Sequence, residues 1–314
     1  MSSTAPTERG SVLAIDIGGT KIEAGIVTAE GALLPDSRVR VATGAAANSA
    51  EGFDSALRDA VAQASAHPEF DDVVGVGIGS AGPLDLGAGT VSPINLPGVR
   101  AFPVVRTARE ASGLQRVSLR LDGTSLGLAE LWQGAAQGVR NAVIFVVSTG
   151  IGGCVVTDGR VVAGASGNAG HLGQMVVDVV DPEHPERATV EGQASGMHTV
   201  AWARAHGWSG STGEDLAAAH AAGDEIALAA VERSVQALGR GLASCANLLN
   251  TELAVMGGGF AHVTEDYPAR VERAAHTASV NEFGRALRVV RVGLGDEAPL
   301  VGAAAQLLHP ELLA

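Results

Sequence analysis

The sequence predicts an α/β protein built from two domains, and three observations support this prediction. The chain has 314 residues, about twice the usual domain length of roughly 150 residues. Apolar runs that end at glycine-rich turns alternate with amphipathic helical segments. The order strand, glycine loop, strand, turn, strand occurs twice, over residues 12–34 and 143–163. Two such copies indicate two related halves, with a ligand cleft expected between them.

The first copy opens on an apolar strand that starts at residue 12 and stops at Gly18-Gly19. The chain continues with alternating apolar residues from 21, turns at Glu30-Gly31 and runs on to residue 34, which predicts three strands joined by hairpins. An amphipathic helix should follow, and then an apolar strand over 73–78. The apolar stripe of that helix consists of Phe53, Leu57, Ala60, Val61 and Ala64.

The second copy has strands over 143–147 and 154–157, a turn at Asp158-Gly159 and a further strand over 160–163. A long helix follows, because six apolar residues are spaced alternately four and three apart and so share one face. These residues are Val231, Val235, Leu238, Leu242, Cys245 and Leu249. We also expect a strand over 253–256, an irregular surface loop over 178–189, and a terminal helix over 298–308 that packs against the N-terminal half.

Composition excludes several classes of partner. The formal net charge is −13 at neutral pH, so a duplex nucleic acid or an anionic membrane surface is not the expected partner, and a small molecule is. No apolar run approaches the roughly 18 residues of a membrane span, and the N-terminus lacks the features of a secretory signal. With only two cysteines, Cys154 and Cys245, the chain fits a reducing compartment, and we expect a cytoplasmic protein without a cysteine-rich zinc site.

Three glycine loops follow apolar strands: Gly18-Gly19, Gly150–Gly153 and Gly257–Gly259. Glycine lets backbone N–H groups approach an anion closely. Beside the first loop, the Asp16 carboxylate can orient hydrated magnesium and the Thr20 hydroxyl can hold phosphate. One such loop alone is better explained as a plain hairpin. Three together favour a nucleotide site with separate contacts to terminal phosphates, inner phosphates and nucleoside.

The order of motifs along the chain resembles the ROK family (repressor, open reading frame, kinase) from residue 12 to about 305. The motifs are Ala14-Ile-Asp-Ile-Gly-Gly-Thr-Lys, Gly77-Ile-Gly-Ser-Ala-Gly-Pro, Asn95-Leu-Pro-Gly, Ser148-Thr-Gly-Ile-Gly-Gly, Gly167-Asn-Ala-Gly and Met256-Gly-Gly-Gly. The resemblance implies a two-domain actin-like ATPase (ribonuclease H-like) fold with a central interdomain cleft. It also implies Mg²⁺-ATP, a sugar acceptor and a homodimer.

The resemblance further predicts domain limits and the nucleotide contacts. The N-terminal domain should span 1–120, completed by a helix at about 298–314, and the C-terminal domain 121–297. About ten residues precede the first strand, too few for the winged helix of the family's repressors, so the kinase branch is expected. The predicted nucleotide and phosphate residues are Asp16 (through hydrated Mg²⁺), Gly18, Gly19, Thr20, Lys21, Thr149, Gly150, Gly152, Gly257, Gly258 and Gly259.

Asp122 is the candidate general base. In family kinases an Asn-Asp pair follows a strand, and its Asp takes the proton of the attacking sugar hydroxyl. Here the matching residues are Leu121 and Asp122, so the sugar-binding Asn is lost and an apolar surface is expected in its place. Taken alone, Asp122 is better explained as a helix N-cap. The phosphate loops favour the catalytic role.

The sugar pocket departs from the family further along the chain. The family's Gly-Glu-x-Gly-His pattern is Gly170-His171-Leu-Gly-Gln174 here, and the zinc-binding cysteines are absent. His171 and Gln174 can still hydrogen-bond hydroxyls, but the zinc site has lost its ligands, so we predict no structural zinc. His184 lies among acidic residues on a loop that we expect to be solvated. Asn95 and Glu191 match the remaining sugar positions.

These departures leave two interpretations. The pocket selects a carbohydrate other than glucose, or the protein is a non-catalytic sugar- or nucleotide-binding member of the family. Because Asp122 and the glycine loops are retained, an ATP-dependent sugar kinase is favoured, with glucose as a poor substrate. Polyphosphate as the donor, the identity of the sugar and the phosphorylated hydroxyl stay open.

Overall fold

The computed structural model describes residues 10–43 and 48–314, which fold as two compact units. Among the described residues, unit 1 comprises 10–43, 48–134, 160–169 and 294–314, and unit 2 comprises 135–159 and 170–293. Residues 1–9, on which the prediction of no secretory signal rests, lie outside the described ranges. Unit 1 is therefore built from segments that are far apart in the sequence, whereas unit 2 is interrupted only by residues 160–169.

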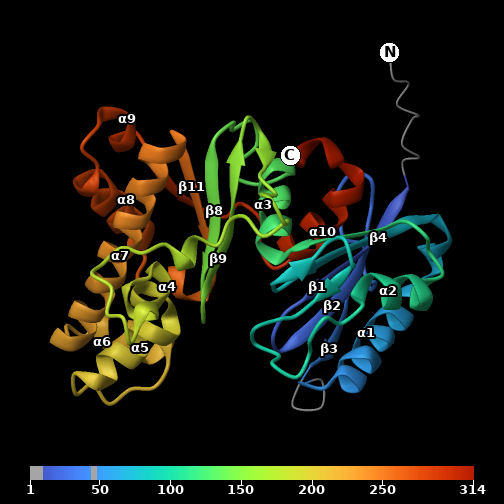
Figure 1. Ribbon diagram of the computed structural model, residues 1–314, viewed down its shortest axis with the longest axis horizontal. Coiled ribbons are helices and arrows are strands. Elements are labelled where there is room, and N and C mark those ends of the chain that lie inside the picture. Colours follow the sequence, from blue (N-terminus) through green and yellow to red (C-terminus); the bar gives the residue numbers. More distant parts are fainter. Residues whose placement is uncertain (1–9, 44–47) are drawn as a thin grey trace. The chain divides into compact units, whose positions relative to one another are not determined.

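A five-stranded mixed sheet forms the centre of unit 1, with the order β3-β2-β1-β4-β7 (Figure 1). Its strands are β1 (Ser11–Ile17), β2 (Lys21–Val27), β3 (Val39–Ala42), β4 (Val73–Ser80) and β7 (Val117–Leu121). The first three strands pair antiparallel, and β4 and β7 are added parallel to β1. A separate small hairpin joins β5 (Leu84–Asp85) to β6 (Thr90–Val91). The carboxyl ends of β1, β4 and β7 consequently meet at one edge of the sheet.

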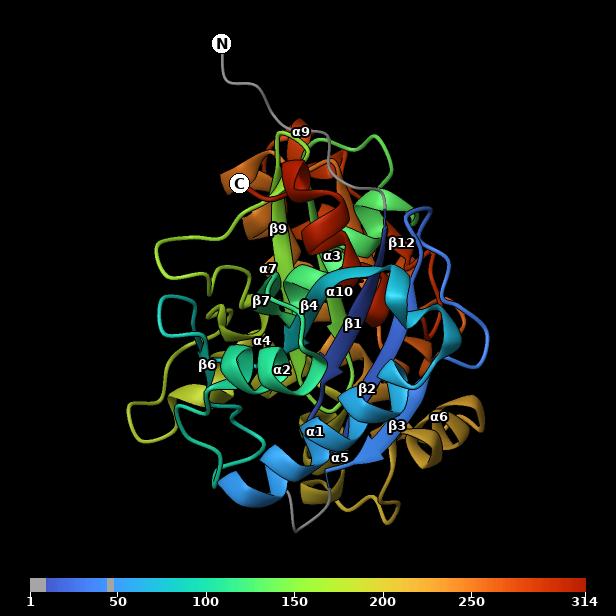
Figure 2. The ribbon, with the colours of Figure 1, turned by 90° about the vertical axis from the view of Figure 1, so that its right-hand side faces the viewer.

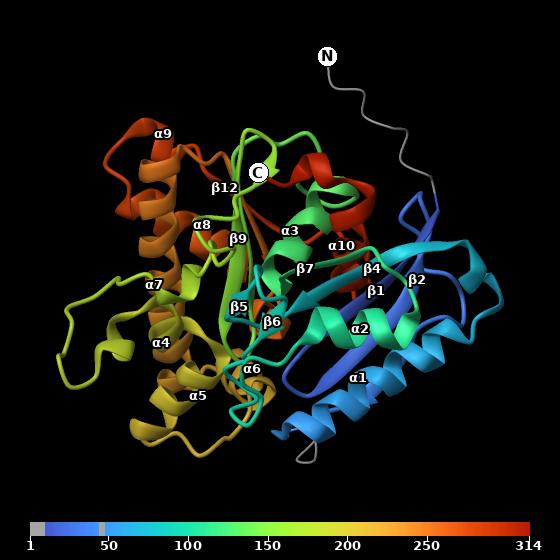
Figure 3. The same ribbon diagram turned by 45° about the vertical axis from the view of Figure 1, so that its right-hand side comes forward.

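Helices cover both faces of this sheet (Figures 2 and 3). They are α1 (Ala50–Ser65), α2 (Val104–Ser112), α3 (Asp122–Trp132) and α10 (Ala298–Leu308). Alternate residues of β1 belong to different apolar clusters: Leu13 packs with the α1 and α2 side, and Ala14 packs with Ala303 of α10. Burial of both faces explains why β1 is an almost continuous apolar run in the sequence.

Unit 2 repeats the strand arrangement around a second sheet of order β10-β9-β8-β11-β12. Its strands are β8 (Ala142–Val147), β9 (Ile151–Thr157), β10 (Arg160–Val161, counted with unit 1), β11 (Leu253–Gly257) and β12 (Arg288–Arg291). Strands β8 and β9 pair antiparallel, whereas β11 and β12 are added parallel to β8. The two predicted copies thus share one topology.

Helices of unit 2 pack against that sheet through a large apolar core that includes Phe145, Leu238 and Tyr267. They are α4 (Val190–Ala194), α5 (Gly196–Ala205), α6 (Gly213–Ala221), α7 (Glu225–Leu249), α8 (Tyr267–Ala278) and α9 (Glu282–Arg285). Short 3₁₀ turns complete the chain: η2 (Pro68–Asp72), η3 (Leu172–Gln174), η4 (Pro185–Ala188), η5 (Gly259–His262) and η6 (Pro310–Leu312). In the described residues, no helix is both long and apolar enough to span a bilayer.

Most expected elements are present, but several bounds differ. Strand β9 begins at Ile151 instead of residue 154, and β10 ends at Val161 instead of residue 163. The third strand of the first copy starts at Val39 instead of running through residues 32–34. Near Leu33 there is only an isolated bridge, because Pro35 has no N–H and the Ser37 hydroxyl accepts a hydrogen bond from Ile26 N at 3.0 Å. The last residue of the predicted helix stripe, Leu249, is half-buried whereas the others are buried.

The expected domain limit at residue 120 and the observed limit at residue 134 differ by one helix. Helix α3 continues directly from β7 and packs on α10, so it lies in unit 1. Helix α10 itself contacts β1 and β4 of the same unit, as expected of an apolar terminal segment with helical spacing.

Candidate functional site

Asp16 lies near the carboxyl end of β1 in unit 1, and its surroundings favour the protonated form of its carboxyl group. Burial raises the pKa of the Asp16 carboxyl from 3.8 to about 7, and the negative charges of Asp122 and Glu23 add to this rise. Lys21 and Arg38 act in the opposite direction but do not offset it. The predicted metal-orienting carboxylate and the predicted base are therefore electrostatic neighbours, and burial together with their mutual repulsion outweighs the two nearby cations.

Asp122 is the first residue of α3, directly after β7. Its Oδ1 atom accepts a hydrogen bond from Gly123 N at 2.7 Å. The N-cap of α3 is Leu121, which makes no side-chain capping bond, so the alternative explanation of Asp122 as an N-cap does not apply. The expectation that Leu121 leaves an apolar surface is also wrong. The Leu121 side chain is buried in the core of unit 1, and a Cβ added to Gly82 would lie 2.6 Å from its Cδ2 atom.

The first glycine loop is a tight turn between β1 and β2, in which Gly18 N donates to Lys21 O at 3.0 Å. Asn95 lies directly over this turn: a Cβ on Gly19 would stand 2.3 Å from the Asn95 Nδ2 atom. Thr20, the predicted hydroxyl ligand, is exposed beside them. Unit 1 thus brings the predicted phosphate loop and one predicted sugar residue together.

Lys21 is engaged within the protein. Its Nζ forms an ion pair with the buried carboxylate of Glu23, which also pairs with Arg38 at 2.8 Å and Arg40 at 2.7 Å. The sequence analysis did not single out Glu23. The alternation of side chains along β2 nevertheless places Lys21 and Glu23, two residues apart, on the same face of that strand. A phosphate contact by Lys21 would compete with this pair.

Glu191 connects the second glycine loop to the altered sugar motif in unit 2. Its Oε2 atom accepts a hydrogen bond from Ile151 N at 2.7 Å, and its Oε1 atom accepts one from Gln174 Nε2 at 3.3 Å. The loop touches the carboxylate so closely that a Cβ on Gly150 would lie 2.7 Å from Oε2. Each carboxylate oxygen keeps a second lone pair that can accept a hydrogen bond from a hydroxyl.

Helix α4 presents Glu191 because its N-cap, Thr189, accepts a hydrogen bond from Gly192 N. His171 and Gln174 flank the 3₁₀ turn η3 and are both exposed. The structure therefore gathers Gln174 and Glu191 with Gly150. His171 lies three residues before Gln174, at the start of the same 3₁₀ turn.

A cavity of about 460 Å³ in unit 2 joins the second and third glycine loops. Its lining residues are Ser148, Thr149, Gly213, Glu214, Ala217, Gly259, Phe260, His262 and Val263. A volume of this size falls within the range of small-ligand pockets. Gly258 shapes the third loop: it has φ of +91°, and a Cβ there would lie 2.4 Å from Val147 O. Only glycine fits this position.

Glu214, Phe260 and His262 are lining residues that the sequence analysis missed. One local signal was available, because Thr212 and Asp215 form the capping box that starts α6, and Glu214 lies in that first turn. The other two follow the third glycine loop and have no pattern of their own. Gly152, in contrast, lies on β9 and is not among the residues that line this cavity.

The segment that carries the zinc ligands in the resembling family is held here by hydrogen bonds. Gln193, buried in α4, donates to Asp178 Oδ2 at 2.8 Å and accepts from Arg240 of α7 at 3.0 Å. His184 forms its contact with Glu186, at 3.3 Å. Among residues 10–43 and 48–314, no three His, Cys, Asp or Glu side chains come together as a metal site. The residues do not fit a zinc ion, and its absence stays a prediction.

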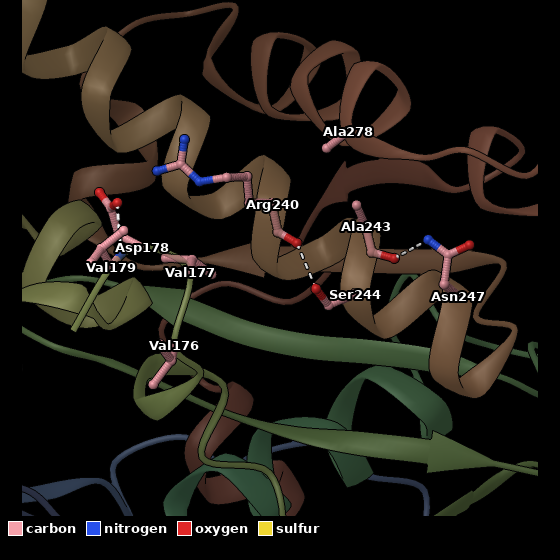
Figure 4. Close-up of a pocket in the computed structure, with 9 residues that line it drawn as sticks. All are labelled: Val176, Val177, Asp178, Val179, Arg240, Ala243, Ser244, Asn247 and Ala278. Atoms are coloured by element: carbon pink, nitrogen blue, oxygen red, sulfur yellow. Dashed lines mark hydrogen bonds between the residues drawn. The ribbon is translucent and has the colours of Figure 1, made fainter.

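The same segment borders an open hollow of about 730 Å³ (Figure 4). Asp178 and Arg240 lie on its rim, and Ser244 and Asn247 of α7 bond to carbonyls of their own helix. None of the predicted site residues lines this hollow, so it is not part of the candidate site.

The model of the ROK family matches residues 12–309 of the chain. Among curated proteins, the chain is similar to the N-acetylmannosamine kinase of Citrobacter koseri, with 35% identity over 267 residues that cover 83% of this chain and 87% of the relative. It is also similar to the N-acetylmannosamine kinase of Shigella flexneri, with 31% identity, 83% of this chain and 87% of the relative.

Two solved structures share both fold and sequence with this chain. A ROK hexokinase from Thermus thermophilus has a TM-score of 0.80 and 33% identity, covering 94% of this chain and 96% of the other. A ROK glucokinase from Streptomyces griseus, solved in complex with glucose and AMPPNP, has a TM-score of 0.79 and 30% identity, covering 95% and 99%. These likenesses confirm the actin-like fold class that the motifs predict.

Proposed function

The chain belongs to the ROK family and is a carbohydrate kinase, and we propose that it transfers the γ-phosphoryl group of ATP to a hydroxyl of N-acetylmannosamine or a similar N-acylated hexosamine. The similarity to curated N-acetylmannosamine kinases over more than four fifths of the chain carries this proposal. The replacement of the family's Glu-x-x-His pair by His171 and Gln174 supports an acceptor other than glucose.

Asp122 is proposed as the general base. It stands at the junction of β7 and α3, where a carboxylate accepts the proton of a sugar hydroxyl that attacks the γ-phosphorus in line. Loss of that proton raises the nucleophilicity of the hydroxyl oxygen. Glu191, Gln174 and His171 of unit 2 and Asn95 of unit 1 are proposed to hold the other sugar hydroxyls. The Glu191–Gln174 hydrogen bond fixes the orientation of both polar groups before the sugar arrives.

The glycine loops are proposed to bind ATP. Backbone N–H groups of Gly18, Gly19, Gly150 and Gly152, with the hydroxyls of Thr20 and Thr149, would take phosphate oxygens. The cavity of about 460 Å³ beside Gly257–Gly259 is proposed for the nucleoside. Lys21 would contact phosphate only by leaving its ion pair with Glu23. The presence of a nucleoside-sized cavity favours ATP over polyphosphate as donor.

The residues of unit 1 fit a magnesium ion. Mg²⁺ prefers carboxylate oxygens and retained water, and Asp16 is a carboxylate whose pKa is raised by burial and by the negative charges of Asp122 and Glu23, which a bound cation would offset. We propose that Asp16 holds hydrated Mg²⁺, which would neutralise developing phosphate charge. We also propose that the protein is a cytoplasmic homodimer without structural zinc.

The test is a transfer assay with purified protein, Mg²⁺ and either ATP or polyphosphate. Acceptors are N-acetylmannosamine, N-acetylglucosamine, mannose, glucose and a polyol, with ADP release measured for ATP and sugar phosphate detected for both donors. We expect ATP-dependent turnover with N-acetylmannosamine at a kcat/KM at least tenfold above that with glucose. Faster turnover of glucose would overturn the acceptor proposal, and ATP binding without transfer to any acceptor would overturn the kinase assignment.

A further inference from the structure

Two arginines of unit 1 line a cavity that contains none of the proposed sugar or nucleotide residues. The cavity has a volume of about 350 Å³ and lies between β7, α2 and the turn that joins β5 to β6. Its lining residues are Leu86, Gly87, Ala88, Gly89, Val105, Arg109, Val117, Ser118, Leu119 and Arg120. This set includes two cations and no Asp or Glu, although the whole chain has a net charge of −13.

Arg120 is held in this place without a compensating negative charge. The side chain is half-buried, and loss of solvation lowers the pKa of its guanidinium, with no carboxylate acting in the opposite direction. Its Nη1 atom donates to Leu119 O at 2.7 Å, while the Nε atom is buried without a hydrogen-bond partner. A buried cation and an unpaired donor both cost free energy unless another group satisfies them.

Arg109 supplies the second cation, from the last turn of α2. Its Nε atom donates to Gln115 O at 3.3 Å, and in the described part of the chain it forms no ion pair. The nearby acids are engaged elsewhere. Glu110 pairs with Arg58 at 2.9 Å, and Asp85 accepts a hydrogen bond from Ala88 N at 2.9 Å. Both guanidinium groups therefore border the cavity with their charges unpaired.

We propose that this cavity is a binding site for a phosphate group, either free phosphate or a phosphate monoester of metabolite size, held by Arg109 and Arg120. Guanidinium groups match the geometry of phosphate and bind it through charge-assisted, paired hydrogen bonds. The Ser118 hydroxyl can donate one more. The cavity lies on β7, the strand that leads into Asp122, so it is a second site separate from the proposed phosphate loops on β1 and β9. This inference does not depend on which sugar the enzyme phosphorylates.

The test is calorimetric titration of the intact protein with inorganic phosphate, a hexose 6-phosphate and sulfate, each at constant ionic strength. Every titration is done with saturating Mg²⁺ and AMPPNP, so that the proposed nucleotide loops are occupied. Arg109→Gln and Arg120→Gln are compared with Arg106→Gln, a control on the same helix whose ion pair with Glu110 is long at 3.9 Å. Activity with ATP and sugar is measured in all variants to show that they are folded.

We expect saturable binding of phosphate and of the hexose 6-phosphate to the wild type. Arg109→Gln should weaken it about tenfold, as removal of a charged hydrogen-bond donor does, and Arg106→Gln should change it less than twofold. Tighter binding of the hexose 6-phosphate than of inorganic phosphate would identify a sugar phosphate as the ligand, and the reverse would identify phosphate itself. Absence of binding, or equal weakening in Arg106→Gln and Arg109→Gln, would overturn the proposal. Arg109 is exposed, so its substitution should not unfold the protein. The comparison of Arg109→Gln with Arg106→Gln therefore tests the proposal even if Arg120→Gln does not fold.

Discussion

Replacement of Asp16 by Asn should stabilise the metal-free protein, and the gain should grow with pH. The pKa of the Asp16 carboxyl is about 7 in the folded state and 3.8 ordinarily. Between these values the folded state holds a proton that the unfolded chain has lost. Stability therefore falls as pH rises from about 4 to about 7, and the wild type carries the full penalty above pH 7. An amide at this position has no charge to bury.

The magnitude follows from the same two pKa values. The difference between about 7 and 3.8 corresponds to about 4 kcal/mol above pH 7. Solvent still reaches part of the Asp16 side chain, which screens the charge, so the expected gain for Asp16→Asn at pH 8 is about 2 kcal/mol. Near pH 4.5 the gain should fall below about 1 kcal/mol, because this pH lies only slightly above the ordinary value of 3.8 and the penalty has only begun to accumulate.

Scanning calorimetry in EDTA at pH 4.5, 6 and 8 measures this effect. The control is Asp71→Asn, which changes an exposed carboxylate in η2 of the same unit. The reasoning is refuted if the difference in melting temperature between Asp16→Asn and the wild type is the same at all three pH values, or if Asp71→Asn shows the same trend. Asp16→Asn should at the same time lose transfer activity, since it removes the proposed magnesium ligand.

Three further substitutions test individual residues. Asp122→Asn should lower kcat by roughly 10²-fold or more while leaving the KM for the sugar within about threefold; an unchanged kcat, measured by ADP release, argues against a base at this position. Glu191→Gln removes a charged acceptor, so the KM for the sugar should rise about tenfold, whereas an unchanged KM places the sugar elsewhere. Gly258→Ala forces a Cβ to within 2.4 Å of Val147 O and should cost at least about 2 kcal/mol of stability by thermal unfolding. Gly259→Ala meets no atom within 4 Å and should be silent, so equal losses in the two variants would contradict this account.

The sequence predicts the strands and glycine loops well because their signals are local. The apolar run that becomes β8 and the repeated hairpins depend on residues next to one another. The long helix α7 shows its buried face through spacing alone. The start of β3 is different, because it depends on the Ser37 hydroxyl reaching the backbone of Ile26, eleven residues away. Hairpin patterns do not encode that contact.

The site residues also divide into those whose positions follow from strand order and those whose positions depend on tertiary packing. Asp16 lies near the end of β1 and Asp122 directly follows β7, and strand order alone brings them to one sheet edge. Glu214 and His262 line one cavity only because α6 and η5 pack beside the second glycine loop, which no spacing in the chain reveals. The burial of Leu121 is a tertiary effect too. Its neighbour Gly82 has no side chain and leaves the space that Leu121 fills.

The altered residues of unit 2 form a connected set, which argues for a changed specificity over a decayed site. Gln174 bonds to Glu191, which in turn accepts the Ile151 N–H of the phosphate loop. Two residues along α4, Gln193 links the segment before η4 to α7. Gln193 is buried and would cost free energy if it were unpaired, whereas the exposed Gln174 keeps its bond to Glu191 although water could replace it. These hydrogen bonds hold the proposed sugar residues against the nucleotide loop by means that need no metal.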